Sequence, residues 1–494
     1  MNSYKLDLEK YAALARQAVA EGCVLLENEG QALPLRDGER VAVFGRMAFH
    51  YYKSGLGSGG LVNTRYVVGI LDALKECEGV HLDEKLMGIY EDWIMENPYD
   101  EGQGWGRVPW CQKEMGVTEE MLDCARRDDV SLVVIGRTAG EDQDNNAKAG
   151  SYCLTETEED MIRRVCEVSK RTVVVLNVGN IIDMSWVQKY HPQAVLYVWQ
   201  GGQEGGNGVA DVLTGKACAC GKLTDTIAAD IMDYPSTENF GDPFKNYYKE
   251  DIYVGYRYFE TFAKDKVLYP FGYGLSYTTF SYSDITLDKS SMNINGEITA
   301  TVTVTNTGKY DGSEVVQLYI RDLIGSVTRP VKELKGFEKV QLAPGETKTV
   351  TMELDKRSFA WYNTELHDWY AASGKYEILI GASSRDIRLS ETIELSSSQV
   401  IPMHIHMNTT LGELFNNPDT KEAAKELTSR YLAAMNGGSD TASQSAAEAI
   451  TEEMVAAMTD SMPLRSLCSF GGFSRAEIQE MIDKLQAIYS NPLK

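Results

Sequence analysis

An acidic segment directly after an apolar run holds the carboxyl groups with the most evident chemical potential. Residues 131–136, SLVVIG, are followed by the polar segment GEDQD (140–144), in which Glu141 has Asp142 and Asp144 as neighbours. A general acid needs a carboxyl group whose pKa is raised towards neutrality, and converging carboxylates raise each other's pKa. Taken alone, such a run is more typical of a solvated acidic turn.

A glycine-rich loop, KSGLGSGG (53–60), is the second candidate segment. Glycines let backbone amides face an anion, as they do in phosphate-binding loops. The loop matches neither the GxGxxG pattern with its acidic partner nor GxxxxGK[ST], so we interpret its glycines as permitting a tight turn between a strand and a helix. Lys53 is kept as a candidate residue of the adjoining cleft.

Two tryptophans, Trp105 and Trp110, stand in the Gly/Pro-containing loop GWGRVPW (104–110). Exposed aromatic rings there could stack on the face of a sugar, whereas buried rings would only serve packing. Both alternatives fit the pattern, and we retain the two residues as candidate substrate contacts.

The cysteines and histidines form no metal-binding pattern. Cys218 and Cys220 make a CxC without a second Cys or His pair at zinc-site spacing, and the six histidines do not cluster with Ser or Cys. We expect no metal and no cofactor. Nine cysteines without a framework spacing, and a start that lacks a secretory signal pattern, favour reduced thiols in a cytoplasmic protein.

The elements that would position these residues alternate between apolar strands and helices. The strands are VAVFG (41–45), SLVVIG (131–136), TVVVLNVG (172–179) and AVLYVWQGG (194–202), each followed by a loop and a helical stretch. This alternation predicts an α/β fold with a mostly parallel sheet buried on both faces, whose ligands bind beyond the strand carboxyl ends. Residues 8–30 before it are interpreted as an amphipathic helix that runs into a loop.

From about residue 284 the hydrophobic period changes from helical to alternating. Segments such as TATVTVTNTG and KYEILIGASS predict an antiparallel β-sandwich of the fibronectin type III-like class. Helical spacing returns afterwards. With 494 residues, we expect three domains: an α/β sandwich over residues 1–283, the fibronectin-like domain over 284–397, and a helical extension over 398–494.

The charge balance excludes two classes of partner. The chain has 48 Lys and Arg against 72 Asp and Glu, a formal net charge of −24. Such a surface repels phosphate backbones and anionic lipids, so neither nucleic acid nor a membrane is expected as a partner. No apolar run approaches the length of a membrane span. A neutral sugar is compatible with this charge.

Many segments, in order and at consistent spacing, resemble the C-terminal region of family 3 glycoside hydrolases of the β-glucosidase and β-xylosidase type. The resemblance covers residues 10–395. It is carried by AEGCVLLENEGQALPL, KSGLGSGGLVNTRYVVGILDAL, VVIGRTAGEDQDN, VWQGGQEGGNGVADVLTG, EDIYVGYRYFETF and VTVTNTGKYDGSEVVQLYI.

The resemblance implies specific site residues. In this family a (β/α)₈ barrel supplies the nucleophile, an Asp in a Ser-Asp-Trp motif, and a Gly-Glu loop of the α/β domain supplies the acid/base. Glu141 matches that acid/base, and Asp142 is a candidate for contacting sugar hydroxyls or holding the loop. The chain contains no Ser-Asp-Trp. Asp368–Trp369 lies within the fibronectin-like segment, where we expect packing.

These features support an O-glycosyl hydrolase that contributes the acid/base domain and needs a separately encoded barrel, acting on a β-glucoside or β-xyloside. A non-catalytic carbohydrate-binding or scaffolding protein of the same fold is the alternative, and a fragment of a longer enzyme is a third interpretation. An α/β domain that leans on a barrel in this family would expose its docking face, so a homo-oligomer is also expected.

Overall fold

A computed structural model of the chain describes residues 6–56, 60, 62–102, 108–138, 144–436, 457, 460–470 and 472–489. Two compact units are distinguished. The first combines Met1–Ala360 with Ala371–Ser397, and the second combines Trp361–Tyr370 with Ser398–Lys494. Within the described ranges, no helix combines the length and the apolar character needed to span a bilayer.

A six-stranded sheet forms the centre of the first part of the chain, in the order β1-β6-β5-β4-β2-β3. Neighbouring strands are parallel, except that β1 runs antiparallel to β6 at one edge. Every residue of β4 and β5 is buried, as continuous apolar runs covered on both faces require. The strands are β1 (Val24–Asn28), β2 (Glu39–Phe44), β3 (Val80–Leu82), β4 (Val130–Arg137), β5 (Thr172–Val178) and β6 (Ala194–Tyr197).

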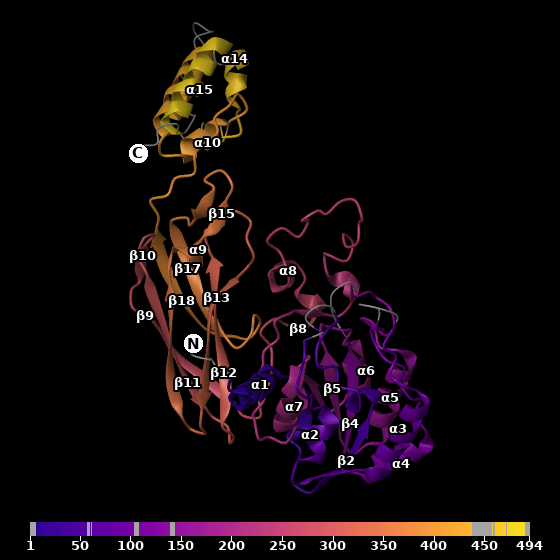
Figure 1. The fold of residues 1–494 in the computed structure, drawn as a ribbon. Coiled ribbons are helices and arrows are strands. Elements are labelled where there is room, and N and C mark those ends of the chain that lie inside the picture. Colours follow the sequence, from indigo (N-terminus) through magenta and orange to yellow (C-terminus); the bar gives the residue numbers. More distant parts are fainter. Residues whose placement is uncertain are drawn as a thin grey trace, which may run out of the picture. The chain divides into compact units, whose positions relative to one another are not determined.

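Helices cover both faces of this sheet, because alternate strand residues point to opposite sides. Leu132 and Val134 pack in one core with α1, α2 and α7, and Val133 and Ile135 pack in the other with α3, α4, α5 and α6. Figure 1 shows the two groups on opposite sides of the strands. The helices are α1 (Leu8–Gly22), α2 (Ile70–Lys75), α3 (Glu84–Glu96), α4 (Glu119–Arg127), α5 (Glu156–Val168), α6 (Ser185–Tyr190) and α7 (Gly205–Leu213).

A β-sandwich follows, with one sheet in the order β10-β18-β17-β12-β13 and the other in the order β14-β11-β9. Burial alternates along β11, as expected of a strand with one face in a core. All pairs are antiparallel except β10 with β18, which is parallel. Its elements are β9 (Phe280–Leu287), β10 (Ser291–Asn293), β11 (Ile298–Asn306), β12 (Gly312–Asp322), β13 (Glu333–Leu342), β14 (Thr347–Leu354), α9 (Lys356–Phe359), β17 (Gly374–Gly381) and β18 (Ile387–Ser396).

Buried polar contacts join the sandwich to the segment that precedes it. This segment holds the short pair β7 (Ile227–Ala228) and β8 (Val267–Tyr269), with α8 (Tyr256–Phe262) between them. The Glu260 carboxylate of α8 accepts from Lys332 at 3.0 Å and from Arg385 at 2.7 Å. Because Glu260 and Lys332 are almost completely buried, this charge cluster ties α8 firmly to the sandwich.

The second unit is mainly helical. Its core is formed by Leu411, Leu427, Leu467 and Ile478. The strand pair of β15 (Trp361–Asn363) and β16 (Asp368–Tyr370) groups with this unit, although its residues interrupt the sandwich in the sequence. The helices are α10 (Leu411–Asn416), α11 (Lys421–Asn436), α14 (Leu467–Phe470) and α15 (Arg475–Tyr489). The α/β sheet, the fibronectin-like sandwich and these helices confirm the predicted fold class.

Candidate active site

The carboxyl ends of β2, β5 and β6 are linked by one buried amide. Asn177, near the end of β5, donates to the carbonyl oxygens of Tyr52 at 3.0 Å and Trp199 at 2.7 Å, and accepts from the Tyr52 N–H at 2.8 Å. Its side chain is fully buried, so each of these bonds replaces one that water would otherwise supply. Asn177 therefore holds the loops after β2 and β6 in a defined position over the end of the sheet.

A buried ion pair anchors the chain after β4. Two hydrogen bonds of 2.6 Å connect the Arg137 guanidinium to the Glu158 carboxylate at the start of α5. Arg137 also donates to the carbonyl oxygens of Ser151 and Cys153. Burial opposes the charge of Arg137, but the neighbouring Glu158 carboxylate outweighs it and raises the pKa of the guanidinium. The charged Arg137 guanidinium thus fixes residues 151–153, at the end of the loop between β4 and α5.

The two carboxylates expected to act here, Glu141 and Asp142, lie outside the described residues, as does Trp105. The residues on either side of Glu141 are described. The Thr138 N–H donates to the Trp110 carbonyl at 2.9 Å, and the Asn145 side chain donates to the carbonyl of Ile181, in the chain after β5, at 3.4 Å. Both ends of the segment that carries Glu141 are therefore attached to the carboxyl edge of the sheet.

Lys53 and Trp110 are described, and both lie at this edge. The Lys53 carbonyl accepts from the Gly202 N–H at 2.7 Å, while its ammonium group is 3.5 Å from the Val62 carbonyl. Trp110 is half-buried, and its backbone contacts the residue directly after β4. The structure thus positions both candidates beside strand ends, and their contact with a substrate stays a prediction.

The chain has two Asp-Trp pairs, and their surroundings differ from those of a nucleophile. Trp369 packs edge-on against Tyr362 in the β15–β16 pair of the second unit. A second pair, Asp92–Trp93, occurs in α3. Trp93 lies under the Arg46 guanidinium at 5.4 Å, and Asp92 is exposed, so this pair serves packing.

Arg46 and Glu114 form a polar network that no motif marks in the sequence. Arg46, almost fully buried after β2, donates to the carbonyl oxygens of Asn97 and Lys113. The Glu114 carboxylate accepts from the N–H groups of Arg46 at 2.8 Å and Met115 at 2.7 Å. Burial raises the pKa of Glu114 to about 7. This network fixes the residues on both sides of the loop that contains Trp105.

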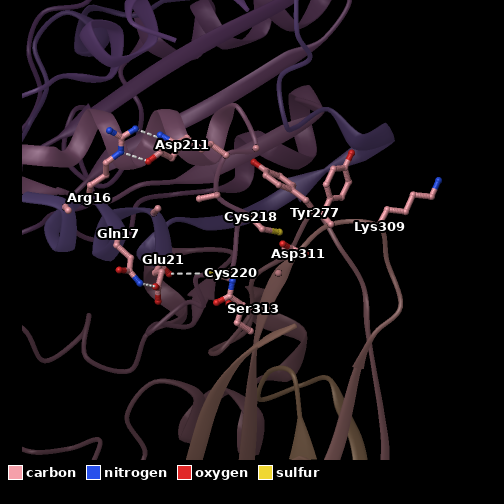
Figure 2. A pocket seen from close by; sticks show the side chains of 18 residues that line it. Arg16, Gln17, Glu21, Asp211, Cys218, Cys220, Tyr277, Lys309, Asp311 and Ser313 are labelled. Carbon is pink, nitrogen blue, oxygen red and sulfur yellow. Dashed lines mark hydrogen bonds and ion pairs between the residues drawn. The ribbon is translucent and has the colours of Figure 1, made fainter. Parts of the chain in front are cut away.

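A pocket of about 800 Å³ lies elsewhere, where α1 and the end of α7 meet the turn between β11 and β12 (Figure 2). Cys218 and Cys220 line it, and the Cys218 thiol is 3.2 Å from the Ser276 hydroxyl. Among the residues whose positions are described, no group of three His, Cys, Asp or Glu side chains is arranged to hold a metal ion.

Two family profiles match the chain in the order of its observed parts. The glycosyl hydrolase family 3 C-terminal domain matches residues 23–277, and a fibronectin type III-like domain matches residues 314–384. The first match includes the six-stranded sheet, the Gly140–Glu141 segment and the loops after β2 and β6.

Curated relatives agree with these profiles. A beta-glucosidase of Ruminococcus albus is 45% identical over 404 residues, which are 80% of this chain and 42% of the relative. A thermostable beta-glucosidase B of Acetivibrio thermocellus is 37% identical over 496 residues, 98% of this chain and 60% of the relative. The chain thus spans about half the length of the curated relatives it matches.

A solved structure gives the same result. The crystal structure of a beta-glucosidase from Paenibacillus barengoltzii superposes with a TM-score of 0.75 and 43% sequence identity, covering 80% of this chain and 45% of that one. The fold, the domain order and the identity over most of the chain agree, and the chain therefore belongs to glycosyl hydrolase family 3.

Proposed function

We propose that this chain provides the acid/base domain of a retaining β-glucosidase, with Glu141 as the proton donor and a separately encoded barrel as the source of the nucleophile. In a retaining glycosidase the two carboxyl groups stand about 5–5.5 Å apart, so the barrel would dock directly over the loop that carries Glu141. Glu141 would protonate the glycosidic oxygen in the first step and deprotonate the attacking water in the second.

The observation that carries the proposal is the anchoring of this loop at the carboxyl edge of a parallel sheet. Ligands of open α/β sheets bind beyond that edge. The bond between Thr138 and Trp110 holds one end of the loop, and Arg137 holds the other end through the carbonyl oxygens of Ser151 and Cys153. An acid/base must be held near its productive position in this way, because small displacements reduce the rate steeply.

The names of the relatives guide the choice of sugar. Those described above are named beta-glucosidases, which supports a β-glucoside over a β-xyloside as the substrate. Lys53 and Trp110 would contribute contacts from the α/β side. Asp142 and Trp105 are proposed to complete them from the neighbouring loops.

An exposed aromatic segment beside the site supports a docked partner. Between β7 and α8, Phe244 and Tyr248 are 91% and 89% exposed, and further large apolar side chains of this segment are also exposed. Tyr234, at the start of the segment, is half-buried near the chain that follows β4. The pKa of Tyr152 in that chain is raised by burial and, to a smaller extent, by the neighbouring Tyr234. Large apolar side chains that are exposed together in one segment are a common feature of interfaces. Without a barrel, the same surface would favour a homo-oligomer.

The acid/base role predicts a dependence on the leaving group. In the complex of this chain with its barrel, we expect Glu141→Gln to lower kcat/KM for cellobiose by about 10²–10⁴-fold. The leaving group of dinitrophenyl β-glucoside needs little protonation. We therefore expect the variant's rate of forming the glycosyl-enzyme from this substrate to fall far less. Azide should then restore turnover and yield β-glucosyl azide, because it attacks the glycosyl-enzyme without a general base.

Two controls define this experiment. The isolated chain should be nearly inert on either substrate, because one general acid contributes far less than a complete glycosidase site. Equal losses on both substrates, without rescue by azide, would rule out Glu141 as the acid/base.

A further inference from the structure

The pocket between α1, the α7–Cys220 segment and the β11–β12 turn is built from two fixed walls. On one side, Arg16 donates to Asp211 through two hydrogen bonds of 2.5 and 2.6 Å. On the other, the turn contributes Lys309 and Asp311, which are labelled in Figure 2. Tyr310, between them in the sequence, also lines the pocket. Its volume of about 800 Å³ falls within the range of roughly 300–1,000 Å³ usual for small-molecule sites.

A buried asparagine holds the turn in shape. The Asn306 amide, completely buried at the end of β11, donates to the carbonyl oxygens of Tyr310 at 2.8 Å and Leu342 at 2.9 Å. Its side-chain oxygen accepts from the Gly308 N–H at 3.0 Å and from the Thr278 hydroxyl at 2.6 Å. Because the turn is ordered before any ligand arrives, binding would not have to overcome its conformational entropy.

The charges of the lining favour a neutral ligand. Arg16, Lys216 and Lys309 are balanced by Glu21, Asp211 and Asp311. Arg16 and Lys216 share the Asp211 carboxylate, and Lys309 and Asp311 stand on the same turn, so cationic and anionic groups alternate within the lining. An anion would therefore meet no uncompensated cationic cluster.

Hydrogen-bonding groups and one aromatic ring remain available to a ligand. Within the described part of the chain, the side chains of Asp311, Ser313 and Gln341 have no hydrogen-bond partner, and all three line the pocket. Tyr310 is 45% exposed, which leaves its ring accessible for stacking. Acceptors, donors and an aromatic face together are the groups that recognise sugar hydroxyls and the apolar face of a pyranose ring.

We propose that this pocket is a second saccharide-binding site, which takes a short neutral β-glucan chain at the junction of the α/β part and the sandwich. It lies apart from the loop of Glu141 and needs no catalytic role for that residue. Its function would be to retain an oligosaccharide on the protein while another is cleaved.

Calorimetric titration of the full chain with cellotetraose tests the proposal. We expect binding that Tyr310→Ala and Asp311→Ala each weaken by roughly tenfold, which corresponds to about 1.4 kcal/mol. Tyr362→Ala is the matched control, since that tyrosine is 48% exposed in the second unit, and it should leave binding unchanged. Thermal unfolding of the three variants checks that each is folded.

Three results would overturn the proposal. One is the absence of cellotetraose binding to the wild-type chain. Another is binding that both pocket variants retain at full strength, which would place the sugar elsewhere, such as at the strand ends. The third is competition by inorganic phosphate at the same pocket, which would contradict the neutral character inferred from the lining charges.

Discussion

The carboxylates of Glu114 and Glu158 differ in their hydrogen-bond donors. Glu158 meets the Arg137 guanidinium through two hydrogen bonds, whereas both carboxylate oxygens of Glu114 accept backbone N–H groups. Burial raises the pKa of Glu114 from an ordinary value of 4.5 to about 7. Between these two pH values the folded chain retains a proton that the unfolded chain releases.

This difference predicts a pH-dependent stability. The contribution of Glu114 is fully present below pH 4.5, declines as the pH rises towards 7, and is constant above that. We expect wild type to lose up to about 3 kcal/mol of unfolding free energy relative to Glu114→Gln across this range, because Gln imitates the protonated acid. Urea unfolding of both proteins at several pH values measures the difference. A difference that does not change with pH would contradict the burial of a titrating carboxyl group here.

At the scale of elements, the buried Arg137–Glu158 pair joins the end of β4 to the first turn of α5. We expect Arg137→Met to lower the free energy of unfolding by about 3–5 kcal/mol, because it leaves the Glu158 carboxylate buried without its cation. Arg163→Met, in the exposed part of α5, removes pairs with Asp160 and Glu167 and should cost at most about 1 kcal/mol. Similar losses in both variants would show that the buried pair has no special role.

Some of these elements follow from the sequence and others do not. The buried strands β4 and β5 were predictable, because uninterrupted runs of Val, Leu and Ile fit a parallel sheet covered on both faces. For residues 24–28 the sequence predicts the end of a helix and a loop, but Val24–Asn28 forms edge strand β1 against β6. This strand pairs with β6, roughly 170 residues later in the sequence. Local periodicity does not reveal so distant a partner.

For the candidate site, the sequence predicts the position of the loop but not the polar network beside it. The position of the Glu141 loop after β4 follows from the order of strand and polar segment. The network of Arg46 and Glu114 was missed, because their burial arises from tertiary packing between segments that no motif connects. The parallel pairing of β10 with β18 is a further local feature that alternation alone does not predict.

At the scale of the whole molecule, the exposed segment between β7 and α8 is the surface proposed to receive the barrel. We expect the double variant Phe244→Asp, Tyr248→Asp to prevent capture of the barrel while the chain stays folded, since both side chains are almost fully exposed. Phe337→Asp, on strand β13 with 66% exposure, is the matched control and should retain capture. Surface plasmon resonance with the immobilised chain measures both. Unchanged capture by the double variant would exclude this surface.

The most direct test of the central claim is a capture experiment with an activity readout. The tagged chain and its Glu141→Gln variant are each incubated with lysate of the source cells, and the eluates are assayed on nitrophenyl β-glucoside and analysed by mass spectrometry. We predict that both retain a barrel protein with a Ser-Asp-Trp motif and that only the wild-type eluate is strongly active, by a factor of about 10²–10⁴. Equal activity of the two eluates, or an inert wild-type chain that retains no such protein, would contradict the account.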